Sequence, residues 1–351
     1  MSSKISILGY DLLGQDGVDG IRYAWSCVGN NQLLESAAFP QHRKGVLDDI
    51  CGYTTSVSMG CILTQLNLAC KFCRTGAELS FYGNLSASDI AKQNVFMVLS
   101  DINCSNHREY QHHQREFAYM GQGEPGYSYV QIREAIELTN IVMNKLDQSV
   151  YRHIISTAGV PEMIKNFKED IQCQYYTERV TLHFSLHATE HRKEIMPIDG
   201  EYSYRTVLEA LKDIRSLTGE KPCIGILLFS EFASCSAVNP YSNDLMQIKK
   251  ILGELSPRDF RLSFCEFNIP SDVDNPSIYD YSRAQQAFDY ALNAGFDAKL
   301  FSSFGRNEST ACGMLSGKNA KNAAGAKWTR LESEAEILVS EAKSLLRRRG
   351  A

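Results

Sequence analysis

Three cysteines lie close together between Cys61 and Cys73, and the last two, Cys70 and Cys73, are spaced as C-x-x-C. Three thiolates can each bind one iron of a four-iron cluster and leave the fourth iron open to a small molecule. A C-x-x-C pair also suits a redox dithiol or half of a zinc site. The chain has no second C-x-x-C, which disfavours a four-cysteine zinc site, and buried unpaired cysteines are the alternative without chemistry.

Polar residues also stand where apolar, strand-like runs of the sequence end. They are Gly123 and Glu124, Ser156, Ser185 and His187, and Asn268. Each one alone could be an ordinary end-of-strand residue, whereas together they would line one rim of a sheet. The glycines that precede Glu124 leave room for a ligand beside the backbone, and the carboxylate can bind an ammonium group.

The elements that must position these residues alternate along the chain from Cys61 onward. Helical patterns separate strand-like runs at residues 117–120, 153–157, 180–187, 223–229, 261–267 and 298–301. Repeated βα units with right-handed crossovers predict a parallel sheet that curls into a full or partial barrel. Chemistry gathers at the carboxyl ends of such strands, which is where the polar residues stand.

The chain before Cys61 is expected to be rich in β-strand. Strand-like runs at residues 21–28 and 33–39 flank a Gly-Asn turn and predict a β-hairpin. Glu35 lies in the second run, where a solvent-facing position is the default for a glutamate. Further along, Ser86 predicts a helix start and Gly219 a helix end.

Composition limits the classes of function. The 351 residues are 44% hydrophobic and 22% charged, which is typical of a globular protein. The sequence has neither a long apolar run for a membrane span nor a signal-peptide core at its start. An odd number of cysteines without small-scaffold spacing favours a reducing cytosol, so we expect a cytoplasmic protein. A net charge of −5 excludes a basic field over the whole molecule, although a local basic patch is compatible with it.

In their order and gaps, the motifs resemble those of radical S-adenosylmethionine (SAM) enzymes, specifically the RlmN and Cfr adenine methyltransferases. The resemblance runs from about residue 19 to about residue 323. The similar stretches are Met120–Pro125 (M-G-Q-G-E-P, where the family has M-G-M-G-E-P), Ile155–Val160, Ser185–Ala188, Ile195–Ile198, Phe267–Asn268 and Ala311–Gly317 (A-C-G-M-L-S-G).

The resemblance implies a role for each matching residue. Cys61, Cys70 and Cys73 would hold a [4Fe-4S] cluster. The residues that would hold SAM are Gly123, Glu124, Ser156, Ser185, His187 and Asn268. Cys312 would carry a methyl group as S-methylcysteine, and Glu35 would accept a proton.

Two departures from the family pattern affect the cysteines. The family spaces its cluster ligands C-x3-C-x2-C, whereas Cys61, Cys70 and Cys73 give C-x8-C-x2-C. An alternative pairing aligns Cys61–Gln65 with the family's C-V-S-T-Q and leaves the first ligand missing; we favour Cys61 as a ligand because Gly60-Cys61 matches the family's G-C. The second catalytic cysteine of the family falls on Thr54, and Cys51 is the candidate to replace it by forming a transient disulfide with Cys312.

The sequence therefore predicts an α/β fold, a partial (β/α)6 radical SAM barrel with an N-terminal β-hairpin extension. We expect a β-rich extension at residues 1–59, the barrel at 60–305, and the methyl-carrier loop and a tail helix at 306–351. The expected activity is methylation of an sp2 carbon of an aromatic heterocycle, most simply adenine in RNA. The family pattern has an RNA-binding domain before the hairpin that has no counterpart here, which weakens the expectation of RNA.

Two alternatives stay open from the sequence. The first is a radical SAM enzyme on the same scaffold that acts on a small heteroaromatic metabolite or a peptide. The second is a cluster-bearing binding protein without catalysis, which Cys312 and the SAM-binding rim argue against. A flavodoxin- or ferredoxin-type electron donor is the expected partner, and no membrane partner is expected.

Overall fold

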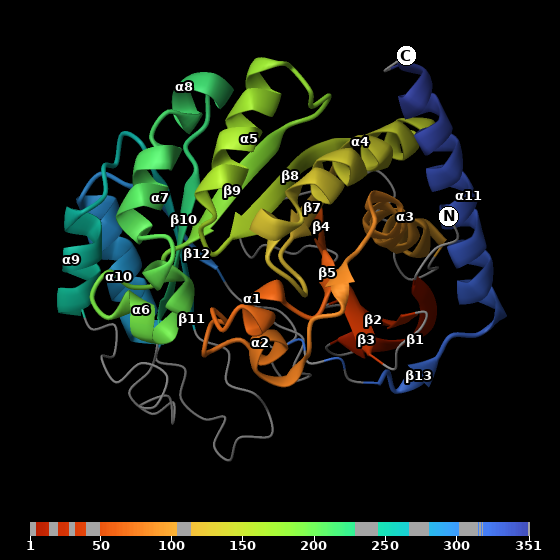
Figure 1. Cartoon of the computed structure of the whole chain (residues 1–351), viewed down its shortest axis with the longest axis horizontal. Helices are drawn as coiled ribbons and strands as arrows, with labels where there is room; N and C mark the ends of the chain where they lie inside the picture. The colour runs from red at the N-terminus through yellow and green to blue at the C-terminus, as the bar shows by residue number, and fades with distance from the viewer. Residues whose placement is uncertain are drawn as a thin grey trace.

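The computed structural model describes residues 5–13, 20–27, 32–39, 50–103, 114–228, 245–266, 281–301, 315, 317 and 319–349. Within these residues one large mixed sheet carries the fold (Figure 1). Its strands are β1 (Ile5–Leu13), β2 (Gly20–Cys27), β3 (Leu33–Phe39), β4 (Ile50–Thr55), β7 (Gln114–Tyr119), β8 (Val150–Thr157), β9 (Val180–Ser185), β10 (Cys223–Leu228), β11 (Arg261–Glu266), β12 (Asp297–Phe301) and β13 (Asn322–Ala323). They are ordered β12-β11-β10-β9-β8-β7-β4-β3-β2-β1-β13.

The larger part of this sheet is parallel. β4 pairs in parallel with β7, and the same direction continues through β8, β9, β10 and β11 to β12. This arrangement confirms the parallel sheet that the alternating pattern predicts. The order of the described strands is linear, with β12 at one end and β13 at the other, so their pairing forms an open sheet.

The smaller part of the sheet is antiparallel and continues from β4. β2 pairs antiparallel with β3, which confirms the predicted hairpin, and β1 extends it on the far side. β3 also pairs antiparallel with β4, so the N-terminal strands are joined to the parallel part without a break. Near the end of the chain, β13 pairs antiparallel with β1 through Tyr10 and Asn322.

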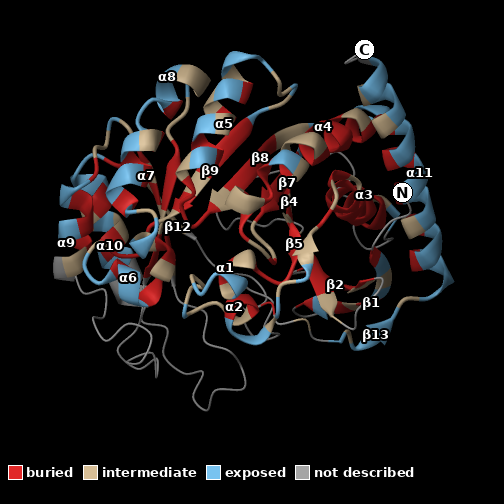
Figure 2. Ribbon diagram, viewed as in Figure 1, coloured by how far each residue is buried: buried red, intermediate tan, exposed pale blue. Residues whose placement is uncertain are grey.

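Helices pack on the sheet and on one another. They are α3 (Ala87–Asn103), α4 (Tyr129–Lys145), α5 (Pro161–Gln172), α6 (Arg192–Ile195), α7 (Tyr204–Leu211), α8 (Ile214–Thr218), α9 (Leu245–Gly253), α10 (Tyr281–Asn293) and α11 (Ala326–Arg349). α3 packs against both α4 and α11, whereas α5 packs against α7 and α8. Figure 2 shows that α3 is buried along nearly all of its length, while α11 keeps an exposed face. The described helices include none with the length and apolarity that a membrane crossing would need.

Local sequence explains where several helices begin and end. The Ser86 hydroxyl accepts a hydrogen bond from the Asp89 N–H at 3.2 Å, which caps α3 as its sequence predicts. Gly219 follows α8 with φ +76°, a left-handed conformation that glycine adopts without strain. The helical chain before Gly219 consists of two short helices, α7 and α8, separated by residues 212–213.

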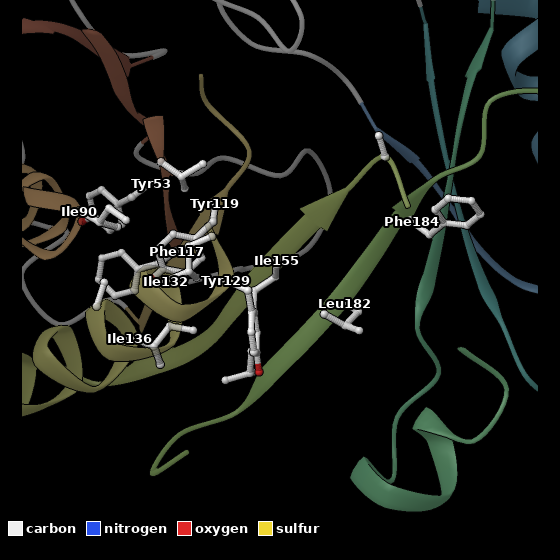
Figure 3. Close-up of a cluster of buried hydrophobic side chains, with 14 of the residues drawn as sticks. Tyr53, Ile90, Phe117, Tyr119, Tyr129, Ile132, Ile136, Ile155, Leu182 and Phe184 are labelled. Carbon is white, nitrogen blue, oxygen red and sulfur yellow. The ribbon is translucent and has the colours of Figure 1, made fainter. Parts of the chain in front are cut away.

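The core lies between the parallel strands and the helices that cover them. Phe117 of β7, Ile155 of β8 and Phe184 of β9 are buried; Figure 3 shows Phe117 beside Ile132 of α4, with Phe184 further along the sheet. Burying one such side chain contributes about 1.5–3 kcal/mol. This core fixes the strands rigidly and thereby places their carboxyl ends.

Candidate functional site

The carboxyl ends of the parallel strands are joined by hydrogen bonds into one edge. Between β4 and β7, Gly121 N–H donates to the Thr55 carbonyl at 3.1 Å, and Gln122 N–H donates to Ser56 Oγ at 2.8 Å. The Val57 N–H returns a bond to the Gln122 carbonyl at 2.9 Å. The loop after β7, which contains the M-G-Q-G-E-P stretch, is therefore held against the loop after β4.

The three-cysteine loop lies on this edge. Cys61 immediately precedes α1 (Ile62–Gln65), and Cys73 immediately precedes α2 (Arg74–Glu78). The Lys71 N–H donates to the Ile195 carbonyl at 2.9 Å, and the Phe72 ring meets the His187 ring edge-on, with centroids 5.2 Å apart. The residues between Cys70 and Cys73 therefore dock on the segment that follows β9.

The three thiols lie close enough to influence one another's ionisation. Burial raises the pKa of the Cys61 thiol to about 12, and the nearby Cys73 adds to the shift. Burial also raises the pKa of Cys70, with further contributions from Cys73 and Cys61. Burial likewise raises the pKa of Cys73. These thiols are free and protonated in water-poor surroundings, so a bound metal group would displace their protons.

This donor set suits a multi-iron cluster better than a single ion. In the part of the chain that the structure describes, no three His, Cys, Asp or Glu side chains converge on one point as a single metal ion requires. A four-iron cluster binds one thiolate per iron, so its ligands need not meet at one point. Three neighbouring thiols on one loop, without a fourth cysteine among the described residues beside them, fit that cluster type.

Glu124 is buried at the end of β7 and connects this strand to β8. Its carboxylate accepts hydrogen bonds from the Gly126 N–H at 2.8 Å, the Ala158 N–H at 2.9 Å and the Thr157 hydroxyl. Burial raises its pKa, while these hydrogen bonds and Arg192 act in the opposite direction. The carboxylate is thus fixed in orientation at the edge, as a group that binds an ammonium should be.

The other expected SAM-binding residues of the described chain stand on the same edge. Ser156 and Ser185 come at the ends of β8 and β9, and both are half-buried. Gly123 has φ +107°, and a Cβ there would lie 2.1 Å from Ser58 Oγ. The space beside Gly123 is therefore filled by the chain's own loop, whereas the sequence interpretation gave that space to a ligand.

His187 is buried beside the cysteine loop in a left-handed conformation, with φ +60°. The His187 backbone N–H donates to the Gly225 carbonyl at 3.1 Å, and the ring Nδ1 accepts from the Leu227 backbone N–H at 3.2 Å. Burial, together with the positive charge of Arg192, lowers the pKa of His187 to about 3. The imidazole is therefore neutral and ties the end of β9 to β10.

Arg192 belongs to this site, although sequence reasoning did not single it out. It is almost fully buried and donates hydrogen bonds to the carbonyls of Leu186 and Ser185, both at 2.9 Å, and of Ala158 at 2.8 Å. Its charge is balanced by Asp199 at 2.8 Å. No periodicity or motif separates this arginine from its charged neighbours in the sequence, so only the structure identifies it.

Glu35, on β3, is buried, with 1% of its surface exposed, so the solvent-facing alternative is wrong. It forms an ion pair with Arg22, and its Oε2 accepts a hydrogen bond from the Gly317 N–H at 2.8 Å. Gly317 ends the A-C-G-M-L-S-G stretch that contains Cys312. The structure therefore brings Glu35 next to the segment that follows the expected methyl carrier.

Cys51 is not brought to the carboxyl edge. It lies at the start of β4, pairs in register with Arg115 at the start of β7, and is buried. Thr55, at the other end of β4, is about 13 Å further along at the usual rise per strand residue. Cys312 and Asn268 lie outside the described residues, as do the loops that contain them.

Comparison with known proteins adds to this geometry. No family model matches the chain. A probable dual-specificity RNA methyltransferase RlmN from Pseudothermotoga lettingae is 28% identical over 277 residues, which are 76% of this chain and 70% of that protein. A dual-specificity RNA methyltransferase RlmN from Bradyrhizobium sp. is 28% identical over 77% of this chain and 65% of its own length.

A solved structure shares the fold. A radical SAM methyltransferase from Sphaerobacter thermophilus superimposes with a TM-score of 0.70 over 90% of this chain and 82% of its own, at 19% identity. The fold is therefore that of a radical SAM methyltransferase. The comparisons confirm the resemblance to the RlmN methyltransferases and support an enzyme of the transferase type.

Proposed function

We propose that this chain is a radical SAM methyltransferase that methylates an sp2 carbon of an aromatic heterocycle through a methylated Cys312. One observation carries the proposal. The Thr75 hydroxyl, two residues after Cys73, donates to the Leu315 carbonyl at 2.6 Å. Leu315 lies three residues after Cys312, so this bond limits how far Cys312 can lie from the cysteine loop.

The residues present suit both cofactors. Cys61, Cys70 and Cys73 would hold a [4Fe-4S] cluster, and the rim residues Gly123, Glu124, Ser156, Ser185, His187 and Asn268 would hold SAM. When bound, these groups supply the electron, the radical and the methyl group that the chemistry needs. The protein's own part is to orient both, through the fixed Glu124 carboxylate and the neutral His187.

Two further residues take roles in this proposal. Glu35 would accept the proton that the substrate carbon loses, and its contact with Gly317 supports a place near Cys312. Cys51 would resolve the product by disulfide exchange, and this role has less support because Cys51 lies at the amino end of β4.

The finer domain division belongs to the same proposal. The six parallel strands from β7 to β12 would correspond to the partial (β/α)6 barrel, bounded at about residues 60 and 305. The extension at residues 1–59 includes β4, whose pairing with β7 makes the extension continuous with that barrel. The methyl-carrier loop and α11 would form residues 306–351.

The relatives' names favour RNA as the first substrate class, since they are RNA methyltransferases, and the motif resemblance implies adenine as the base. RNA binding depends on phosphate contacts by lysine and arginine. Exposed cations of the described chain include Lys321, Arg347 and Arg348. A small heteroaromatic metabolite is the second candidate, because a net charge of −5 provides no general attraction to RNA.

The first test is anaerobic reconstitution with iron and sulfide. Cys61→Ala, Cys70→Ala and Cys73→Ala should each lose the cluster absorbance and the release of 5′-deoxyadenosine from SAM. Cys173→Ala, at an exposed free cysteine on another face of the fold, is the matched control and should retain both. An intact cluster in Cys61→Ala would overturn the choice of ligands.

The second test concerns the methyl carrier. Mass spectrometry of the wild-type protein should find the Cys312 peptide heavier by one CH2 group. Cys312→Ala should still cleave SAM but transfer no methyl group to any acceptor. Methyl transfer by this variant would remove Cys312 from the mechanism.

The third test decides between substrate classes. The affinity of the protein for ribosomal and transfer RNA is measured over a salt series. The expected flavodoxin- or ferredoxin-type electron donor is left out, so that binding is measured without turnover. Micromolar or tighter binding that weakens steeply with salt would support RNA. Absence of binding even at low salt would leave the small-molecule substrate.

A further inference from the structure

We propose that Asp11, Arg22 and Glu35 form a buried clamp that positions the chain immediately after Cys312, with Arg22 as its positioning residue. The proposal rests on the methyl-carrier role of Cys312 stated above. We name the described residues Leu315, Gly317 and 319–323 the carrier-proximal segment. The clamp is composed of three charged side chains on three neighbouring strands.

The three side chains are joined across β1, β2 and β3. Asp11 and Arg22 are register partners in the antiparallel pair of β1 and β2. Arg22 Nε donates to Asp11 Oδ2 at 2.9 Å, and its guanidinium also forms ion pairs with the carboxylates of Asp11 and Glu35. All three are at least 95% buried. Buried charges are stable only when paired, so removing one partner leaves the others uncompensated.

Each member of the clamp also binds the backbone of the carrier-proximal segment. Glu35 Oε2 accepts from the Gly317 N–H at 2.8 Å, and Asp11 Oδ1 accepts from the Lys321 N–H at 2.5 Å. Between them, Arg22 Nη2 donates to the Asn319 carbonyl at 3.0 Å. Three successive alternate residues are therefore held by charge-assisted hydrogen bonds, which are stronger than neutral ones.

The segment is held at both of its ends as well. Upstream, the Leu315 carbonyl accepts the bond from Thr75 beside the cysteine loop. Downstream, Asn322 and Ala323 pair with β1 as β13. The clamp therefore fixes the position of the carrier-proximal segment between the N-terminal strands and the cysteine loop. That position determines the point from which the chain leads back toward Cys312.

The clamp also couples the charge of Glu35 to this register. Both carboxylate oxygens of Glu35 are engaged, one by Arg22 and one by Gly317. A proton on Glu35 would weaken both bonds, because a neutral carboxyl accepts more weakly than a carboxylate. Proton acceptance by Glu35 would then loosen the carrier-proximal segment at the end of a turnover.

The test uses hydrogen–deuterium exchange of the full chain without added cofactors. Arg22→Gln removes the positive charge at the centre of the clamp. Arg22→Lys keeps that charge but lacks the planar guanidinium that donates to several partners at once. Arg115→Gln is the matched control, because Arg115 is an equally buried arginine paired with Asp101 at 2.5 Å at the start of β7. A second pair of variants changes an exposed residue instead of a buried one. Lys321→Pro removes the N–H that Asp11 binds together with the exposed lysine side chain, and it fixes φ. Lys321→Ala removes the side chain but keeps that N–H.

We expect exchange in the peptide covering residues 315–323 to rise at least about tenfold in Arg22→Gln and Lys321→Pro, the loss expected for one charge-assisted hydrogen bond. Arg22→Lys should lie between wild type and Arg22→Gln. The two controls should exchange like wild type in this peptide. Unchanged exchange in both Arg22→Gln and Lys321→Pro would overturn the clamp.

A second readout, the methylated fraction of Cys312 after reconstitution and incubation with SAM, tests positioning. It should fall several-fold in Lys321→Pro relative to Lys321→Ala. Faster exchange with unchanged methylation would show an anchor without a positioning role and would overturn that part. If wild type itself shows no methylated Cys312, the proposed function fails, while the exchange result still decides the clamp.

Discussion

Gln122 is the residue at which the chain departs from the M-G-M-G-E-P pattern, and its side chain is fully buried. Its Nε2 donates weakly to the Leu33 carbonyl at 3.4 Å, while its Oε1 has no hydrogen-bond partner among the residues that the structure describes. A buried acceptor without a partner costs about 1–3 kcal/mol. The protein therefore carries a local cost exactly where its relatives' pattern has an apolar side chain.

Replacing Gln122 with methionine should stabilise the protein without added ligands. Methionine fills a similar volume and removes the unpaired oxygen, so we expect the free energy of unfolding to rise by about 1 kcal/mol. Urea denaturation measures this change, with Gln93→Met as the control. Gln93 is equally buried, but its Oε1 accepts a hydrogen bond from the Ser56 N–H and its Nε2 donates one to the Ser56 carbonyl. A destabilised Gln122→Met would show that the oxygen has a partner in solution.

His153 makes stability depend on pH. It is fully buried between the stacked rings of Phe117 and Tyr119, its Nε2 lies 2.8 Å from Asn140 Oδ1, and burial lowers its pKa to about 3. The unfolded chain binds this proton near pH 6.5 and the folded chain does not, so stability is complete above pH 6.5 and falls as the pH drops toward 3. The contribution lost between pH 7.5 and pH 5 is about 2 kcal/mol.

The variant His153→Gln should flatten this dependence. Glutamine can keep a donor and an acceptor in place but cannot be protonated. Unfolding measured from pH 7.5 to pH 5 should lose about 2 kcal/mol less in the variant than in wild type. Equal slopes would mean that His153 is already protonated in the folded protein or that other buried histidines dominate.

The sequence was enough to predict which polar residues stand at the strand ends. It was not enough to predict which charged side chains are buried or with which residues they pair. The rim residues from Gly123 to His187 fell on one edge because parallel strands share their carboxyl ends. The burial of Glu35 and of Arg192 could not be predicted from the sequence. Glu35 bonds Gly317 and Arg192 bonds Ala158, and both partners lie far away in the sequence. Cys51 failed to reach the edge because strand position, not spacing from Cys61, determines its place.

At the scale of elements, short apolar runs predicted the parallel strands from β7 to β12 to within a few residues, since buried strands read as continuous apolar sequence. The parallel strand β4 was not predicted. The expected run 180–187 continues past β9 because His187 leaves the strand in a left-handed conformation. β1 and β13 were not predicted, because β13 is a short pair that forms only when β1 is beside it. Distant pairing is the part that local sequence does not encode.

Gly123 shows how closely two of these elements approach. Gly123→Ala would place a Cβ against Ser58 Oγ at 2.1 Å and also strain a φ of +107°. Gly219→Ala is the matched control, since its φ is +76° and a Cβ there meets nothing within 4 Å. We expect the control to lose about 1–2 kcal/mol of stability from strain alone. Gly123→Ala should lose more and also weaken SAM binding, and equal losses in the two variants would contradict the close approach.

At the scale of the whole molecule, Lys92 joins three elements that are far apart in the sequence. It lies on α3, is almost fully buried, and donates to the Ile5 carbonyl of β1 and to Glu332 of α11, both at 2.8 Å. Its ammonium therefore ties the last helix to the first strand through the centre of α3. The tail helix, expected as a surface element, has one face fixed in the fold by this contact.

Lys92→Met should destabilise the protein by about 3 kcal/mol, because it leaves the Glu332 carboxylate without its buried partner. The double variant Lys92→Met/Glu332→Gln removes the uncompensated charge and should recover part of that loss. Thermal unfolding of the two variants measures the difference. An additive loss in the double variant would show that Lys92 and Glu332 act independently.

The pairing of β13 with β1 has a consequence for how the protein is made. Asn322 must reach Tyr10, so the outermost strand of the N-terminal sheet gains this neighbour only after nearly the whole chain has left the ribosome. Contacts this distant in sequence form late and slowly. Until then β1 is an uncovered sheet edge that can pair with another chain. A nascent chain stalled before residue 322 should therefore be more prone to aggregation than the finished protein.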